Sequence, residues 1–149
     1  MTDSPRMDLA ERERLLGLYA TGYDEVLNAL DGVTDEDWDK REAEGEWTVR
    51  EIVHHLADSE MNAASRIRMV VADQDPQIRN YDQNAWTAKF SFPERPLDIS
   101  MIAFKAARET TVPVLAILTE DDWQRTGSHS EFGPMTAETW LEWYGPHAH

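Results

Sequence analysis

The chain has 149 residues with 29 acidic and 14 basic side chains, a formal net charge of −15, five histidines and no cysteine. This length suits one domain, spanning 1–149, that buries its own core without disulfide bonds. The excess of acidic residues and the lack of a basic run argue against binding to nucleic acid or to an anionic membrane surface. Without cysteine, any transition metal must be held by histidines and carboxylates.

The first residues indicate no targeting signal. Asp3, Arg6 and Asp8 interrupt any apolar stretch there, and no segment of the chain approaches the roughly 18–20 apolar residues of a membrane-spanning helix. We therefore expect a cytoplasmic protein.

Two helices are predicted in the first half of the chain. Apolar residues recur every three to four positions over Leu9–Leu30, and Asp31-Gly32 gives a stop signal. Thr48 and Glu51 have the spacing of a capping box, so a second helix is expected over Val49–Ala72.

The second half predicts two more helices after a long crossover. Residues 73–98 show no sustained period, a helix is expected over Ile99–Leu118 with a kink at Pro113, and a last one over Ala137–His149. Short hairpin loops would make the first two helices antiparallel, and likewise the last two. The predicted fold class is all-α: a four-helix bundle running up-down-down-up, with the crossover between the second and third helices.

An internal similarity supports two hairpins on one plan. The segments Val33–Lys40 and Leu118–Arg125 share the pattern Thr-x-x-Asp-Trp after a helix and are each followed by another helix. The alternative is a common helix-start signal that is used twice.

The second helix carries polar residues near its apolar stripe of Ile52, Leu56, Ala63 and Ile67. At about 100° per residue, His54 is expected to be exposed, and His55 to flank the core between helices. Glu60 falls within the stripe, where an unpaired carboxylate is costly, so it requires a partner such as Arg108 or a position at a cavity.

His55 and His147 are the histidines best placed to share an ion. Superposing the second hairpin on the first puts His147 at the depth of Ser59, on the helix of His55. On a regular helix His147 and His149 would point about 200° apart, so both could bind one ion only if the end of the helix is unwound. The alternative is that His55 is hydrogen-bonded between helices and that the last two histidines belong to a frayed terminus.

Three segments resemble the DinB/YfiT-like superfamily of candidate metal-dependent enzymes. They are Trp47-Thr-Val-Arg-Glu-Ile-Val-His-His-Leu-Ala-Asp-Ser-Glu-Met-Asn62, Tyr81-Asp-Gln-Asn-Ala-Trp86 and Trp143-Tyr-Gly-Pro-His147. The resemblance covers essentially the whole chain. It implies a bundle, often a homodimer, that holds a divalent metal such as zinc or nickel with three histidines, here His55, His147 and a third at position 151, beyond His149.

The third ligand is therefore open. Either His149 substitutes for it from an unwound end, or the last helix is incomplete at its C-terminus. A helix over Ala137–His149 would be about 20 Å long against about 36 Å for the second helix, which favours the latter.

The function implied by the resemblance is metal-dependent chemistry on a small molecule. Hydrolysis and transfer of a low-molecular-weight thiol are both expected from relatives, and the lack of cysteine is compatible with a thiol cosubstrate. The alternative is a non-catalytic, dimeric bundle. Asp58 is either a partner that orients an imidazole or a solvated surface acid, while Trp86, Tyr81 and Arg66 either line the mouth of the site or, for Trp86, cover the core.

Overall fold

The first two helices begin and end where the sequence predicts. In the computed structural model, which describes residues 7–149, they are α1 (Leu9–Leu30) and α2 (Val49–Ala72). Asp8 accepts a hydrogen bond from the backbone N–H of Ala10 at the start of α1. Thr48 and Glu51 form the predicted capping box of α2, which satisfies N–H groups that the first turn leaves free.

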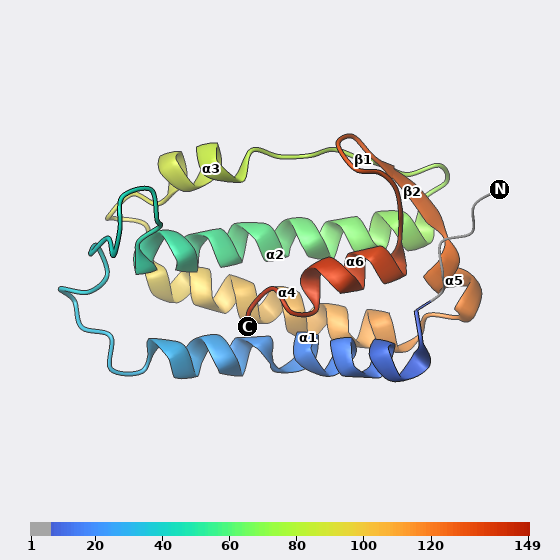
Figure 1. Cartoon of the computed structure of the whole chain (residues 1–149), viewed down its shortest axis with the longest axis horizontal. Helices are drawn as coiled ribbons and strands as arrows, with labels where there is room; N and C mark the ends of the chain where they lie inside the picture. The colour runs from blue at the N-terminus through green and yellow to red at the C-terminus, as the bar shows by residue number, and fades with distance from the viewer. Residues whose placement is uncertain (1–6) are drawn as a thin grey trace.

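Two further helices complete a four-helix bundle, α4 (Leu97–Ala116) and α6 (Ala137–Tyr144). Figure 1 shows α2 and α4 running in one direction, and α1 and α6 in the other. Pro113 lies inside α4, which continues for three more residues. The third predicted helix is thus present, displaced by two residues.

Helices α1 and α2 face each other across the bundle. Each packs against both α4 and α6, with α4 behind and α6 in front in Figure 1. The expectation that they would form an adjacent hairpin is wrong, because the link over residues 31–48 is long enough to let α4 and α6 enter between them. Helix α2 thus contacts α3 (Gln83–Phe90), α4, α6 and two strands.

A small sheet closes one end of the bundle, and the sequence did not predict it. Strand β2 (Thr126–His129) pairs in parallel with β1 (Gln77–Ile78) and antiparallel with β3 (Gly133–Thr136). A Cβ atom on Gly127 would lie 3.2 Å from Pro76 and 3.4 Å from Val70, so glycine allows the sheet to approach α2 closely. Strands of two to four residues are too short for a detectable alternation.

Two short helices occupy segments that were expected to be irregular. Helix α3 (Gln83–Phe90) lies within the crossover and is capped by Asp82, and α5 (Glu120–Gln124) follows Thr119. Thr119 forms a capping box with Asp122 and Trp123 is buried, whereas the similar segment around Trp38 forms only turns. The repeated pattern thus starts a helix in one of its two copies.

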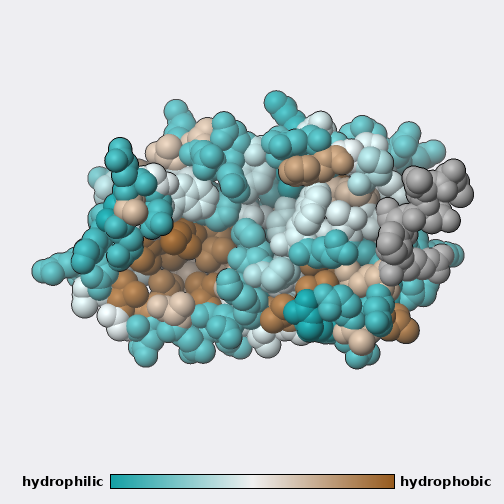
Figure 2. All heavy atoms as spheres, viewed as in Figure 1, coloured by the Kyte–Doolittle hydropathy of each residue, from teal (hydrophilic) through white to brown (hydrophobic). Residues whose placement is uncertain are grey.

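The last helix ends at Tyr144, five residues before the predicted end at His149. Pro146 has no N–H to continue the ladder, and residues 145–149 form turns through His147 N to Tyr144 O and His149 N to Pro146 O. Beyond the end of α6, Figure 2 shows hydrophobic atoms between α1 and α2, on a face that is otherwise largely hydrophilic. The short last helix leaves that half of the bundle less covered, as its length predicts.

No helix within residues 7–149 combines the length and apolarity that crossing a membrane requires.

Candidate metal centre

Helix α2 is buried on nearly all sides along its middle section. Every residue from Val53 to Glu60 is buried, including His54, His55, Asp58 and Ser59. The reason is its position, since α3, α4, α6 and the sheet all contact it. Ile52, which we expected in the apolar stripe, is 42% exposed instead. The single stripe was a poor guide because α2 has several buried faces.

His55 and His147 lie beside each other. His55 projects from α2 and His147 from the turn after α6, and their ring centroids are 5.5 Å apart. Trp47 lies against the His55 ring at 4.7 Å, and Tyr144 lies 6.0 Å from the His147 ring. The pair that the sequence singled out is thus brought together by residues far apart in the chain, with an aromatic ring against each imidazole.

Burial keeps both imidazoles neutral near neutral pH. It lowers the pKa of His147 to about 4, with the neighbouring His55 and the positive charge of Arg108 acting in the same direction. Burial also lowers the pKa of His55. The Nδ1 atom of His147 is buried and has no hydrogen-bond partner among residues 7–149. A neutral imidazole with a free nitrogen is the form that binds a metal ion, so these two residues fit a divalent ion.

His149 is not part of this pair. Its Nε2 lies 2.8 Å from the carbonyl oxygen of Leu18, and its Nδ1 lies 4.0 Å from Glu25. In the described part of the chain, no group of three or more histidine or acidic side chains is arranged to hold a metal ion. The structure therefore brings together two of the three histidines that were expected to hold the ion.

His54 is buried, and the prediction that it is exposed was wrong. Its Nδ1 is 2.6 Å from Ser100 Oγ on α4, and burial lowers its pKa to about 4. The prediction assumed that α2 has one covered face, whereas α4 packs over the side that carries His54.

Glu60 has the partner that its position required. Its carboxylate accepts hydrogen bonds from Tyr19 Oη at 2.7 Å and from Arg108 Nε at 3.2 Å. Arg108 also donates to the carbonyl oxygens of Tyr19 and Tyr144. This network connects α1, α2 and α4 to the last residue before the turn that carries His147.

Asp58 does not match either expected role. It is buried and forms two hydrogen bonds with Arg95, at 2.8 and 3.1 Å. It is thus neither a solvated acid nor bonded to an imidazole. Together with Arg95 it lines a separate hollow beside Trp86, so Trp86 lies outside the cavity next to His147.

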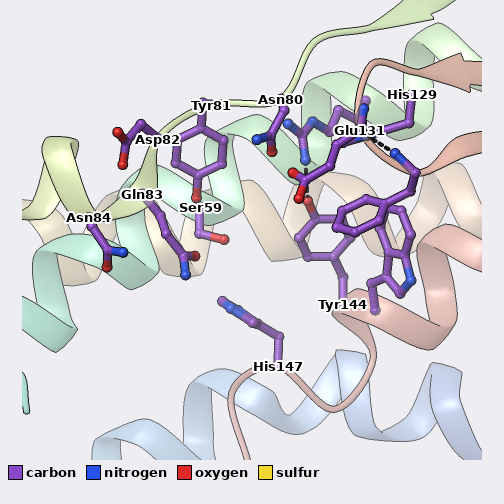
Figure 3. A pocket seen from close by; sticks show the side chains of 13 residues that line it. Ser59, Asn80, Tyr81, Asp82, Gln83, Asn84, His129, Glu131, Tyr144 and His147 are labelled. Atoms are coloured by element: carbon purple, nitrogen blue, oxygen red, sulfur yellow. Dashed lines mark hydrogen bonds between the residues drawn. The ribbon is translucent and has the colours of Figure 1, made fainter.

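A cavity of about 570 Å³ opens beside His147 (Figure 3). Its walls come from α2, the crossover, the β2–β3 hairpin and α6. Tyr81 and Arg66 line it as expected, together with Ser59, Tyr144 and His129. The 570 Å³ is within the range of small-molecule sites.

His129 is a cavity residue that the sequence left unassigned. Its Nδ1 accepts backbone N–H groups from Glu131 at 3.0 Å and Phe132 at 3.2 Å, and its ring packs edge-on against Trp143. The signal for it would have been the turn at residues 130–132 before Gly133, which marks His129 as the last residue of the first strand of a hairpin. Its free nitrogen makes it a polar group of the cavity wall, separate from the His55–His147 pair.

Comparison with known proteins gives consistent matches. The model of the DinB superfamily matches residues 18–149. A protein of Oceanobacillus iheyensis named as a candidate metal-dependent hydrolase is 31% identical over 125 residues, 82% of this chain and 72% of its own length. A Bacillus cereus protein of the same designation is 29% identical over 130 residues, 83% of this chain and 72% of its own.

A solved structure matches the whole chain. It is YfiT from Bacillus subtilis, described as a metal-dependent hydrolase candidate with an unusual four-helix bundle topology. The TM-score is 0.88 at 26% sequence identity, over 100% of this chain and 86% of that one. The resemblance seen in the sequence motifs is thus confirmed at the level of the fold.

Proposed function

Since the chain belongs to the DinB superfamily, we propose that it is a metal-dependent hydrolase whose metal ion is held by His55 and His147. The observation that carries the proposal is the pair of neutral, adjacent imidazoles, one with an unpartnered nitrogen, next to a cavity. The names of the relatives support the same reaction class.

A zinc or nickel ion would supply Lewis acidity at neutral pH when bound. The protein's own contribution is positional. Trp47 packs against the His55 ring and limits its rotation. The Arg108 bond to the carbonyl oxygen of Tyr144 holds the turn that carries His147. Two protein ligands leave positions for water, for a substrate atom or for a third side chain.

His149 is the third side chain that we propose. It stands two residues beyond His147, on a turn and not on a helix, so the geometric objection to both residues binding one ion is removed. Joining the site requires its Nε2 to leave the carbonyl oxygen of Leu18.

Metal content of the purified, untagged chain tests the site. We expect about one zinc or nickel ion per chain by elemental analysis, and loss of the ion in both His55→Ala and His147→Ala. His129→Asn is the matched control, because it removes an imidazole from the same cavity and keeps an acceptor for the backbone N–H groups of the hairpin. Weaker binding in His149→Ala would identify the third ligand.

Turnover distinguishes the reaction classes. We expect metal-dependent hydrolysis of a 4-nitrophenyl ester that is lost on chelation and in His147→Ala. Thiol-dependent turnover of a chlorobimane without ester hydrolysis would favour transfer of a low-molecular-weight thiol, with the thiol as cosubstrate since the chain has no cysteine. A wild-type metal content near zero, or one unaffected by His55→Ala, would contradict the enzyme and favour a non-catalytic bundle.

We also propose a small-molecule substrate, a homodimer and a cytoplasmic location. The cavity volume supports the first, and sedimentation velocity of the purified chain tests the second.

A further inference from the structure

We infer that Arg66 binds an anionic group, a carboxylate or a phosphate, of the molecule that enters the cavity beside His147. The inference deepens the proposed function, and rests on it only in treating that molecule as the substrate. Arg66 projects from α2, three turns after His55, and lines the cavity.

Arg66 is a buried cation that has only neutral partners. The residue is 7% exposed, and its guanidinium donates to Tyr144 Oη and to the carbonyl oxygen of Arg79, each at 2.8 Å. The ring of Tyr81 lies 5.5 Å from it. Burial raises the pKa of both tyrosines, so neither phenol supplies a negative charge near neutral pH.

The buried arginines Arg12 and Arg108 both form ion pairs with carboxylates. Arg12 pairs with Glu120 and Glu138, and Arg108 pairs with Glu60. The ion pairs formed among residues 7–149 do not include Arg66. A buried cation without an anionic partner is costly. A ligand that supplies the anion would therefore gain the favourable ion pair that the protein itself does not form with Arg66.

The guanidinium keeps donors free for such a ligand. It has five N–H groups in a planar fork that fits a carboxylate or a phosphate, and protein acceptors take up two of them. Among residues 7–149, none of its nitrogens is buried without a hydrogen bond, so the protein leaves no unmet donor atom there that would bar a ligand. Since Arg66 lines the cavity, a ligand anchored there would extend toward His147.

The two carboxylates on the cavity do not take the place of an anion at Arg66. Asp82 and Glu131 are both exposed, and Asp82 accepts the backbone N–H of Ala85 at the start of α3. Neither lies within 4.0 Å of the guanidinium. Their charges favour a ligand whose anion is confined to the Arg66 end.

A titration of the metal-free protein tests the inference. The probes are acetate and inorganic phosphate, with chloride at the same ionic strength as the reference, and the readout is the amide NMR resonances of Tyr81 and Tyr144. We expect saturable shifts with at least one probe and none with chloride. In Arg66→Gln the Kd should rise at least about tenfold, as expected for the loss of a charge-assisted hydrogen bond.

The control is Arg68→Gln, because Arg68 is on the same helix but donates to Thr110 and Thr111 of α4. Arg66→Lys keeps the charge and loses the fork, and should show an intermediate Kd if Arg66→Gln does not fold. Equal shifts with chloride, or the same Kd in wild type and both Arg66 variants, would overturn the inference. The titration uses metal-free protein, so its outcome does not depend on whether His55 and His147 bind a metal. Conversely, a failed titration leaves the metal-content measurement unaffected.

Discussion

At the scale of single residues, Glu60 shows how a charged group can lie inside this bundle. It is fully buried, and burial raises the pKa of its carboxyl group, while Arg108 and the Tyr19 hydroxyl favour the ionised form. A buried ion pair of this kind adds little to stability over an apolar pair, but breaking it leaves a lone charge in the core.

Replacing one member of the pair should therefore be severe. We expect Glu60→Leu to lower the free energy of unfolding by about 3–5 kcal/mol, because Arg108 loses the one carboxylate that it pairs with among residues 7–149. Urea denaturation followed by circular dichroism measures this.

Two controls accompany that measurement. The double variant Glu60→Leu with Arg108→Leu should lose less than the sum of the two single changes. Glu109→Gln, at the exposed end of a 3.8 Å pair with Lys105, should change stability by less than about 0.5 kcal/mol. Additive losses in the double variant would show that the two side chains stabilise the fold independently.

At the scale of elements, a capping residue marks the start of α2 but does not by itself make a helix. Thr48 accepts the backbone N–H of Glu51 at 3.2 Å and starts α2. Thr34 also has an acidic residue, Asp37, three positions later, and its backbone N–H and hydroxyl both donate to that carboxylate. Even so, no helix starts there.

We therefore expect Thr48→Ala to destabilise the protein by about 1 kcal/mol. Thr34→Ala should cost less, because its contacts are exposed and cap no helix. Thermal unfolding of both variants against wild type gives the comparison, and equal losses would argue against capping as the cause.

The limits of sequence reasoning also lie at this scale. Periodicity and caps gave the bounds of α1 and α2 because both helices are long and carry their own signals. The sheet was missed because β1 pairs with β2 across some 50 residues, and no local pattern records that pairing. The partner of Glu60 followed from the need to satisfy a buried carboxylate, and the His55–His147 pair from superposing the two hairpins and from the family resemblance. The burial of His54 depended on which helices are neighbours.

At the scale of the whole molecule, buried neutral histidines make stability depend on pH. Burial lowers the pKa values of His54 and His147 from 6.5 to about 4. Between these values the unfolded chain binds more protons than the folded one, so stability is full above about pH 6.5 and is lost as the pH falls toward 4.

In metal-free protein we expect the free energy of unfolding to fall by about 1–2 kcal/mol between pH 6.5 and about 5 because of His54, and His147 adds to this fall. Urea denaturation at several pH values measures the slope. His54→Asn should flatten the curve by removing one titrating group, and an unchanged slope would contradict the assignment.

The placement of α1 and α2 on opposite sides of the bundle has a consequence for synthesis of the chain. The first 72 residues contain two complete helices, and each packs against both α4 and α6, which follow later in the chain. A ribosome that has released only this part has produced two apolar faces with nothing to cover them. We therefore expect the apolar faces of α1 and α2 to stay uncovered until α4 and α6 have emerged, which is later than in a bundle of adjacent hairpins.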